Sequence, residues 1–214
     1  MNSLKSLFVL VLLFSSINLF SQGSAYNRFS AEITTGVHVP LSPNDGVSRS
    51  NYVGFRQFQL SGRYMFNTKF GIKGHYGYNS FVNTDDKDFG VNYNRVGLEG
   101  VLNVGRLLNV NFHIRETFGL LFHTGVGVTL SNPTTITGTD RMGNIMAGFT
   151  GQIKINNDIS LAGDMTYFRT IKQHYGYAGN NLFAGKSGVS GGFVNVSIGL
   201  IFNIGEERHH ADWY

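Results

Sequence analysis

Apolar and polar residues alternate along most of this chain with a period of two. From Phe29 onward, positions 31, 33, 35, 37 and 39 hold Ala, Ile, Thr, Val and Val, whereas the intervening positions hold Ser, Glu, Thr, Gly and His. Successive side chains of a strand point to opposite faces, so this period predicts β-strands with one apolar and one polar face. The alternation recurs in eight segments, over residues 29–39, 57–66, 70–79, 95–104, 117–128, 145–155, 159–167 and 194–204.

The connections between these segments differ in length. Residues 67–69 and 156–158 suit tight turns, whereas residues 105–116 are too many for a tight turn and match no strand pattern. Short turns at one rim, long loops at the other and an even number of strands of about ten residues are typical of membrane barrels. The sequence therefore predicts an all-β fold, an eight-stranded antiparallel up-and-down transmembrane β-barrel. The long polar loops are residues 40–52, 80–92, 131–144 and 170–191, which hold all three prolines, Pro40, Pro43 and Pro133.

Charged residues indicate which face of the barrel points outward. None lies on the apolar face of any segment, whereas a lipocalin-like barrel with a water-facing exterior would have no reason to exclude them. A charge facing lipid at mid-depth costs roughly 2–4 kcal/mol, so the apolar face is expected to contact the membrane. The polar face then fills the narrow lumen. The charges expected to line the lumen are Glu32, Arg63, Lys73, Arg95, Glu99, Lys154 and Asp164. Aromatic residues expected in the two interface girdles are Tyr64, Phe66, Phe70, Tyr76, Tyr78, Tyr93 and Tyr167.

Three regions are expected along the chain. Residues 1–21 form a cleaved signal peptide, with Lys5 before an apolar run, Leu7–Phe14, that is too short to span a bilayer. Residues 22–205 form the barrel, and residues 206–214 form a short periplasmic tail. No cysteine is present, which excludes disulfides, thiolate metal sites and a lipoprotein anchor. The expected location is the bacterial outer membrane, and Gly199, Phe202 and Ile204 have the spacing of a signal for the barrel-insertion machinery.

The chain resembles the N-terminal barrel of OmpA-like outer-membrane proteins. Residues 93–106 resemble the fourth strand and its turn, residues 118–127 resemble the fifth strand, and Gly205 with residues 210–214 resembles the junction with a periplasmic domain. The resemblance implies a membrane barrel of structural or accessory role. The family's peptidoglycan-binding domain would follow that junction and is absent from this sequence, so the family's tethering role is not expected here.

The inward charges and the histidines are the residues that could support chemistry in this barrel. The inward charges predict a salt-bridge network, because buried charges must be paired, and the alternative is a gated pore with the network as its gate. A lipid-modifying enzyme would need a base beside a nucleophile. However, His38, His75 and His123 lie on the inward register, and no serine is placed convincingly near His174. No catalytic residue and no cofactor are therefore expected.

The loops and the tail offer the remaining candidate sites. His174, Tyr175, Tyr177 and Phe183 form an aromatic-rich loop that suits a recognition surface. The tail could hold a metal, but a flexible segment is the stronger expectation, because adjacent histidines rarely converge on one ion without a rigid scaffold. There is no phosphate-binding loop or basic run, so no nucleic acid is expected as a partner. The possible metal ligands in the tail are Glu206, Glu207, His209, His210 and Asp212.

The expected function is that of a non-enzymatic outer-membrane barrel, either structural or an accessory subunit of a larger outer-membrane complex. A narrow passive, porin-like channel for small solutes is the alternative, and a lipid-modifying enzyme is the third possibility. The expected partners are outer-membrane lipid and lipopolysaccharide, the insertion machinery during biogenesis, and the larger complex.

Overall fold

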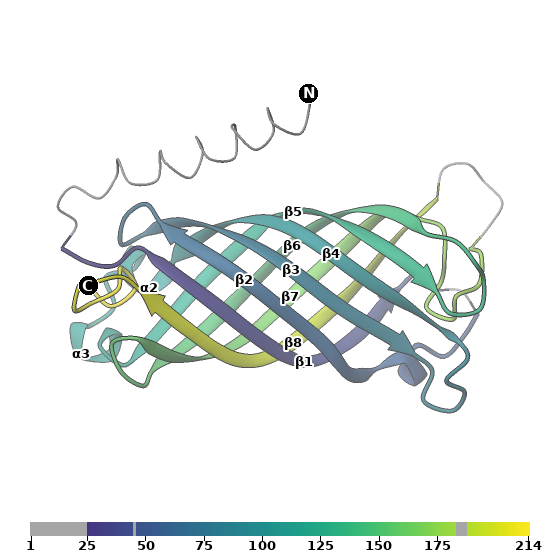
Figure 1. The fold of residues 1–214 in the computed structure, drawn as a ribbon, viewed down its shortest axis with the longest axis horizontal. Helices are drawn as coiled ribbons and strands as arrows, with labels where there is room; N and C mark the ends of the chain where they lie inside the picture. Colours follow the sequence, from purple (N-terminus) through teal and green to yellow (C-terminus); the bar gives the residue numbers. More distant parts are fainter. Residues whose placement is uncertain (1–24, 45, 183–187) are drawn as a thin grey trace, which may run out of the picture.

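The chain forms a closed antiparallel barrel in which each strand pairs with the next and β1 closes on β8 (Figure 1). This computed structural model describes residues 25–44, 46–182 and 188–214, so the expected signal peptide and Phe183 lie outside the described residues. The predicted fold class and strand number are confirmed. The strands are β1 Phe29–Ser42, β2 Gly54–Met65, β3 Phe70–Val82, β4 Gly90–Asn103, β5 Phe118–Pro133, β6 Asp140–Lys154, β7 Ile159–Gln173 and β8 Val189–Ile204.

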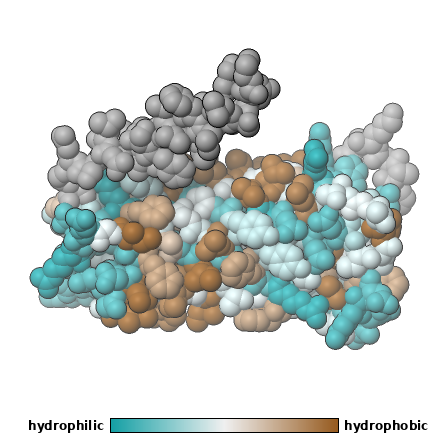
Figure 2. Space-filling model, viewed as in Figure 1, coloured by the Kyte–Doolittle hydropathy of each residue, from teal (hydrophilic) through white to brown (hydrophobic). Residues whose placement is uncertain are grey.

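The apolar face of the barrel points outward, as predicted. Outward side chains such as Ile33, Leu98 and Val126 are exposed, whereas the inward Arg63 and Arg95 are fully buried. Figure 2 shows apolar residues over the wall and hydrophilic side chains gathered at the two ends. Such a surface is stable only against lipid, since exposed apolar patches of this extent are rare on soluble proteins. Within the described residues, no helix is long and apolar enough to cross a bilayer.

The strands are longer than the alternation predicted, and the additional residues lie at the long-loop end. Two expectations are wrong as a result, because Pro40 lies within β1 and Pro133 ends β5, rather than both lying in loops. The pairing of β1 with β2 ends at His38, so at Pro40 only β8 lies alongside, opposite Phe193. A proline is tolerated where one side of the strand needs no hydrogen bond.

Asparagine side chains shape the short-turn rim. Asn67 Oδ1 accepts hydrogen bonds from the backbone N–H groups of Lys69 (2.8 Å) and Phe70 (2.9 Å), and Asn156 does the same in the turn before β7. Between β4 and β5 lie two short helices, α2 Val104–Leu107 and α3 Phe112–Arg115. Asn103 and Asn111 cap them by accepting from the backbone N–H of Arg106 and His113. These helices occupy the connection for which the alternation predicted no structure.

Gly199 is a position where the barrel accepts no side chain. A Cβ there would overlap the backbone oxygen of Ile33 and lie 2.7 Å from Thr34 Cα, whereas a Cβ at Gly163 would meet nothing within 4 Å. We expect Gly199→Val to prevent folding into detergent, because the clash is with backbone and exceeds the usual overpacking penalty of about 1–3 kcal/mol. Gly163→Val should fold. The measurement is the change in gel migration on boiling after refolding without any cellular machinery.

The same assay separates this steric role of Gly199 from its predicted role in targeting. Phe202 points to lipid, so Phe202→Ala should refold in detergent even if it impairs insertion in cells. Normal refolding of Gly199→Val would contradict the steric argument and leave only the targeting prediction for this residue.

Candidate functional site in the barrel lumen

A buried ionic cluster surrounds Glu99 on β4. Lys73 Nζ lies 3.6 Å and His75 Nδ1 lies 2.8 Å from Glu99 Oε1, and both residues come from the neighbouring β3. His123 on β5 bridges two acids, with Nδ1 at 2.5 Å from Glu99 Oε2 and Nε2 at 2.9 Å from Asp164 Oδ2 on β7. We name Lys73, His75, Glu99, His123 and Asp164 the central ionic cluster. It ties four strands together across the lumen.

The hydroxyl groups of β6 and β7 complete the hydrogen bonding of Asp164. Thr150 donates to Asp164 Oδ2 (2.7 Å), and Thr166 donates to Oδ1 (2.6 Å). A buried carboxylate is stable only when its oxygens are satisfied, and here each oxygen has at least one partner. The arrangement is that of a structural ion network. No hydroxyl in it is activated by a histidine.

Arg63 holds a second ionic cluster nearer the short-turn rim. Its Nε lies 2.8 Å from Glu32 Oε1, and its Nη1 lies 2.8 Å from Asp212 Oδ1 of the C-terminal segment. Ser61 donates to the second oxygen of Glu32 (3.2 Å). All of these groups are buried. We name Glu32, Arg63 and Asp212 the rim ionic cluster.

The C-terminal segment is docked in the barrel end, so the expectation of a flexible tail is wrong. Gly205 has a φ of 150°, which side-chain-bearing residues rarely adopt, and the chain turns back there toward the lumen. The backbone N–H of Ala211 donates to Asn27 O (2.8 Å), and Asn27 Nδ2 donates to Glu207 O (2.7 Å). Residues His210–Trp213 are consequently buried, and we name residues 206–214 the C-terminal plug.

The possible metal ligands of this segment diverge. Glu206 and Glu207 are exposed, His210 is buried, and Asp212 binds Arg63. In the part of the chain that the structure describes, no group of three histidine or acidic side chains could hold a metal ion. Burial alone would raise the pKa of Asp212, but the positive charge of Arg63 outweighs it and holds that pKa well below its usual range. Asp212 is therefore an ionised partner of Arg63.

Arg95 and Lys154 form no ion pair with any described residue, although they were predicted to share one network with the other charges, and Arg95 touches the central ionic cluster only where its Nε donates to His75 Nε2 (3.4 Å). Arg95 lies over the ring of Phe168, 3.9 Å from its centroid, and donates to Asn79 Oδ1 (3.1 Å). Lys154 is half-buried at the short-turn rim and forms no ion pair with any described residue. His75, His123 and Asp212 also belong to the ionic clusters, although they were not predicted as members. The alternation placed both histidines on the inward face, but Asp212 lies outside the predicted strands, so no sequence pattern indicated that it points into the lumen.

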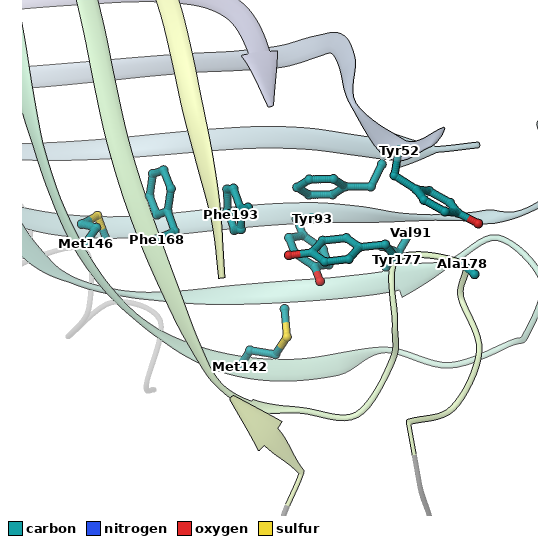
Figure 3. Packing of buried hydrophobic residues seen from close by; sticks show 10 residues of the cluster. Tyr52, Val91, Tyr93, Met142, Met146, Phe168, Tyr177, Ala178 and Phe193 are labelled. Atoms are coloured by element: carbon teal, nitrogen blue, oxygen red, sulfur yellow. The ribbon is translucent and has the colours of Figure 1, made fainter. Parts of the chain in front are cut away.

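An aromatic cluster fills the lumen at the long-loop end (Figure 3). Tyr177, from the last long loop, points into the lumen, where its ring centroid lies 4.8 Å from that of Phe81 and 6.3 Å from that of Tyr93. Its hydroxyl donates to Gly192 O (2.9 Å). Tyr93 is fully buried here, so its predicted place in the outer girdle is wrong. The inserted aromatic cluster consists of Tyr52, Phe81, Val91, Tyr93, Met142, Met146, Phe168, Tyr177, Ala178 and Phe193.

The expected loop recognition surface is not one exposed patch. Tyr177 is 0% exposed, which removes it from any surface. His174 is anchored to Asp140, whose carboxylate accepts from the His174 backbone N–H (2.7 Å) and lies 2.9 Å from its Nδ1. Tyr175 is half-buried beside it. Among the described residues of this loop, Tyr177 packs into the barrel rather than facing solvent.

Between the two ends, side chains from different strands meet inside the lumen. Asn79 Nδ2 on β3 donates to Asn195 Oδ1 on β8 (2.9 Å). The ring of Phe168 stacks on that of Phe193, with centroids 4.7 Å apart. A concavity of about 870 Å³ lies instead on the outer wall, lined by residues that include Gly74, Leu98 and Val126. Side chains from opposite walls therefore meet across the lumen, as expected for a barrel of eight strands.

Comparisons with known proteins agree with this architecture. No protein-family model and no curated protein matches the chain. Among solved structures, Neisserial surface protein A aligns over 85% of this chain and 98% of its own, with a TM-score of 0.52 and 11% identity. A major outer membrane protein from Thermus thermophilus aligns over 83% of this chain and 98% of its own, with a TM-score of 0.51 and 11% identity. The chain is an eight-stranded outer-membrane β-barrel.

Identities this low establish the fold. At that level, the expected fold of an eight-stranded outer-membrane barrel is confirmed. The N-terminal β-barrel domain of Pseudomonas aeruginosa OprF aligns over 83% of this chain and 99% of its own, with 13% identity and a TM-score of 0.47. The lipid-requiring exterior of this barrel and the shared fold place it in the bacterial outer membrane.

Proposed function

We propose that this barrel is a non-enzymatic outer-membrane protein with a structural or accessory role, which acts through its exterior and rims. The observation that carries the proposal is the filled lumen. The C-terminal plug, the two ionic clusters and the inserted aromatic cluster follow one another from the short-turn rim to the long-loop rim. Because they lie in series, a passive channel for small solutes would have to bypass or displace all of them.

An enzymatic role has less support. A lipid-modifying site needs a nucleophile within hydrogen-bond reach of a base. His75 and His123 are buried and paired with acids, and the accessible His174 is paired with Asp140. Among the described residues, no serine or threonine hydroxyl hydrogen-bonds to His174.

Planar-bilayer recording tests the proposal against the channel alternative. We expect the refolded wild-type barrel to show no discrete conductance steps. A chain ending at Gly205 and a Tyr177→Ala variant should each also stay closed, because each keeps the obstruction at the other rim. Tyr175→Ala, in the same loop but outside the aromatic cluster, is the matched control. Reproducible conductance steps from the wild-type barrel would overturn the proposal in favour of a channel.

Co-purification tests the accessory role. An affinity tag between Asp86 and Lys87, in an exposed loop, avoids the C-terminal plug. Outer membranes extracted in mild detergent should yield a second membrane protein at constant stoichiometry. A barrel that purifies alone would contradict the accessory role.

A further inference from the structure

The α2–α3 connection lies directly beyond the lipid-facing end of β4 and β5. Phe118, the first residue of β5, and Phe70, opposite Leu102 of β4, point outward and are exposed at this rim. Figure 1 shows α2 and α3 at the same end of the barrel as the C-terminus. Short turns mark the periplasmic end of such barrels, so α2 and α3 lie at the level of the headgroups of the periplasmic leaflet.

This connection carries exposed apolar side chains, unlike the other two turns of the rim. The turns at 67–69 and 156–158 are polar, whereas Leu108 is 68% exposed and Phe112 is 52% exposed. Leu107 and Ile114 are also exposed. Short amphipathic segments of this kind lie in the membrane interface with their apolar side chains among the upper parts of the acyl chains. These four exposed side chains lie at the end of the barrel next to the lipid-facing residues Phe70 and Phe118 and are free to contact lipid there.

Two arginines accompany these apolar residues without a neutralising acid. The side-chain carbons of Arg115 lie 3.8 Å from the position that a Cβ would take at Gly105, so this side chain packs against α2 next to Arg106. Neither arginine forms an ion pair with any described residue, and the Nε of each is buried without a hydrogen-bond partner. Burial, and then the positive charge of Arg115, lowers the pKa of Arg106.

We propose that Arg106 and Arg115 bind the phosphate of an anionic phospholipid of the periplasmic leaflet, with Leu107, Leu108, Phe112 and Ile114 against its chains. Guanidinium groups match phosphate oxygens in geometry, and a bound anion removes the repulsion between the two cations. The apolar side chains distinguish a lipid from free phosphate, because only a lipid supplies both groups at this depth.

Native mass spectrometry of the refolded barrel tests this site. The barrel in detergent is titrated with phosphatidylglycerol, and retained lipid is counted on the intact protein. The double variant Arg106→Gln/Arg115→Gln should retain the lipid at least about tenfold more weakly, since two charge-assisted contacts are removed. The matched control is Arg141→Gln/Arg169→Gln, which removes two exposed arginines from the opposite half of the barrel and should bind like wild type.

Two further arms separate lipid from free phosphate. Leu108→Ser/Phe112→Ser should also weaken retention, and inorganic phosphate at millimolar concentration should not displace the lipid. Equal retention by wild type and Arg106→Gln/Arg115→Gln would overturn the proposal. So would displacement by inorganic phosphate together with unchanged binding by Leu108→Ser/Phe112→Ser, which would indicate a simple anion site. Gel migration before and after boiling verifies that each variant is folded.

Discussion

Replacing Glu99 with alanine is expected to lower the barrel's free energy of unfolding by about 3–5 kcal/mol, because it leaves buried cations without their partner. Glu99 is the residue that Lys73, His75 and His123 share, and all four side chains are almost fully buried. The variant leaves Lys73 with no ion pair among the described residues. It also removes one of the two acids that hold His123.

Urea unfolding in detergent, followed by gel migration of the folded and unfolded forms, measures this loss. Lys154→Ala is the control, because this half-buried lysine at the rim forms no ion pair and its removal should change stability by no more than about 0.5 kcal/mol. In the double variant Lys73→Met/Glu99→Ala, the loss should be smaller than the sum of the single losses, since the orphaned cation is gone. Equal stability of Glu99→Ala and Lys154→Ala would show that the central ionic cluster does not hold the barrel together.

The strands were predictable because membrane and lumen impose opposite chemistry on alternate residues. Ile33 and Glu32 are neighbours in the chain, yet one faces lipid and the other a buried guanidinium. The alternation changes at the long-loop end for a physical reason. There the lumen is filled by Phe81, Tyr93 and Phe193, whereas outward neighbours such as Asn92 and Asn94 are polar, so the apolar and polar faces exchange relative to the rest of the strands.

The partners of each charge were less predictable than their inward register. Lys73 and Glu99 are opposite each other in the ladder, but His123 reaches Asp164 past the intervening β6. Such a contact depends on the curvature and stagger of the closed barrel, which alternation does not encode. Tyr177 and Asp212 were missed for a related reason. Both lie outside the predicted strands, in a loop and a tail that fold back into the lumen.

Replacing Arg63 with alanine is the second change expected to have a large effect. It leaves two carboxylates, Glu32 and Asp212, buried without their shared cation, and a loss of about 3–5 kcal/mol is expected. The C-terminal plug should undock, because Asp212 is the residue that ties it to the strands through a charge. Trp213 is the single tryptophan and is buried, so its fluorescence should shift to longer wavelength and become accessible to a soluble quencher.

Arg208→Ala is the matched control, since this exposed arginine of the same segment forms no ion pair among the described residues. Its Trp213 fluorescence should match that of wild type. Unchanged quenching in Arg63→Ala would show that contacts other than this ion pair, such as the hydrogen bonds of Asn27, are sufficient to hold the plug in place.

The pH dependence of docking gives an independent check on the same contact. Asp212 faces Arg63 and His210, and Glu32 lies on the far side of Arg63. Because the folded pKa of Asp212 is held below its ordinary value of about 3.9, its contribution to docking is complete above that value and is lost as the pH falls toward the folded pKa. Wild-type Trp213 should therefore stay protected at pH 5 and become accessible only in stronger acid. Asp212→Asn should dock more weakly at pH 7 and lose this acid transition, and an identical transition in that variant would assign it to another group.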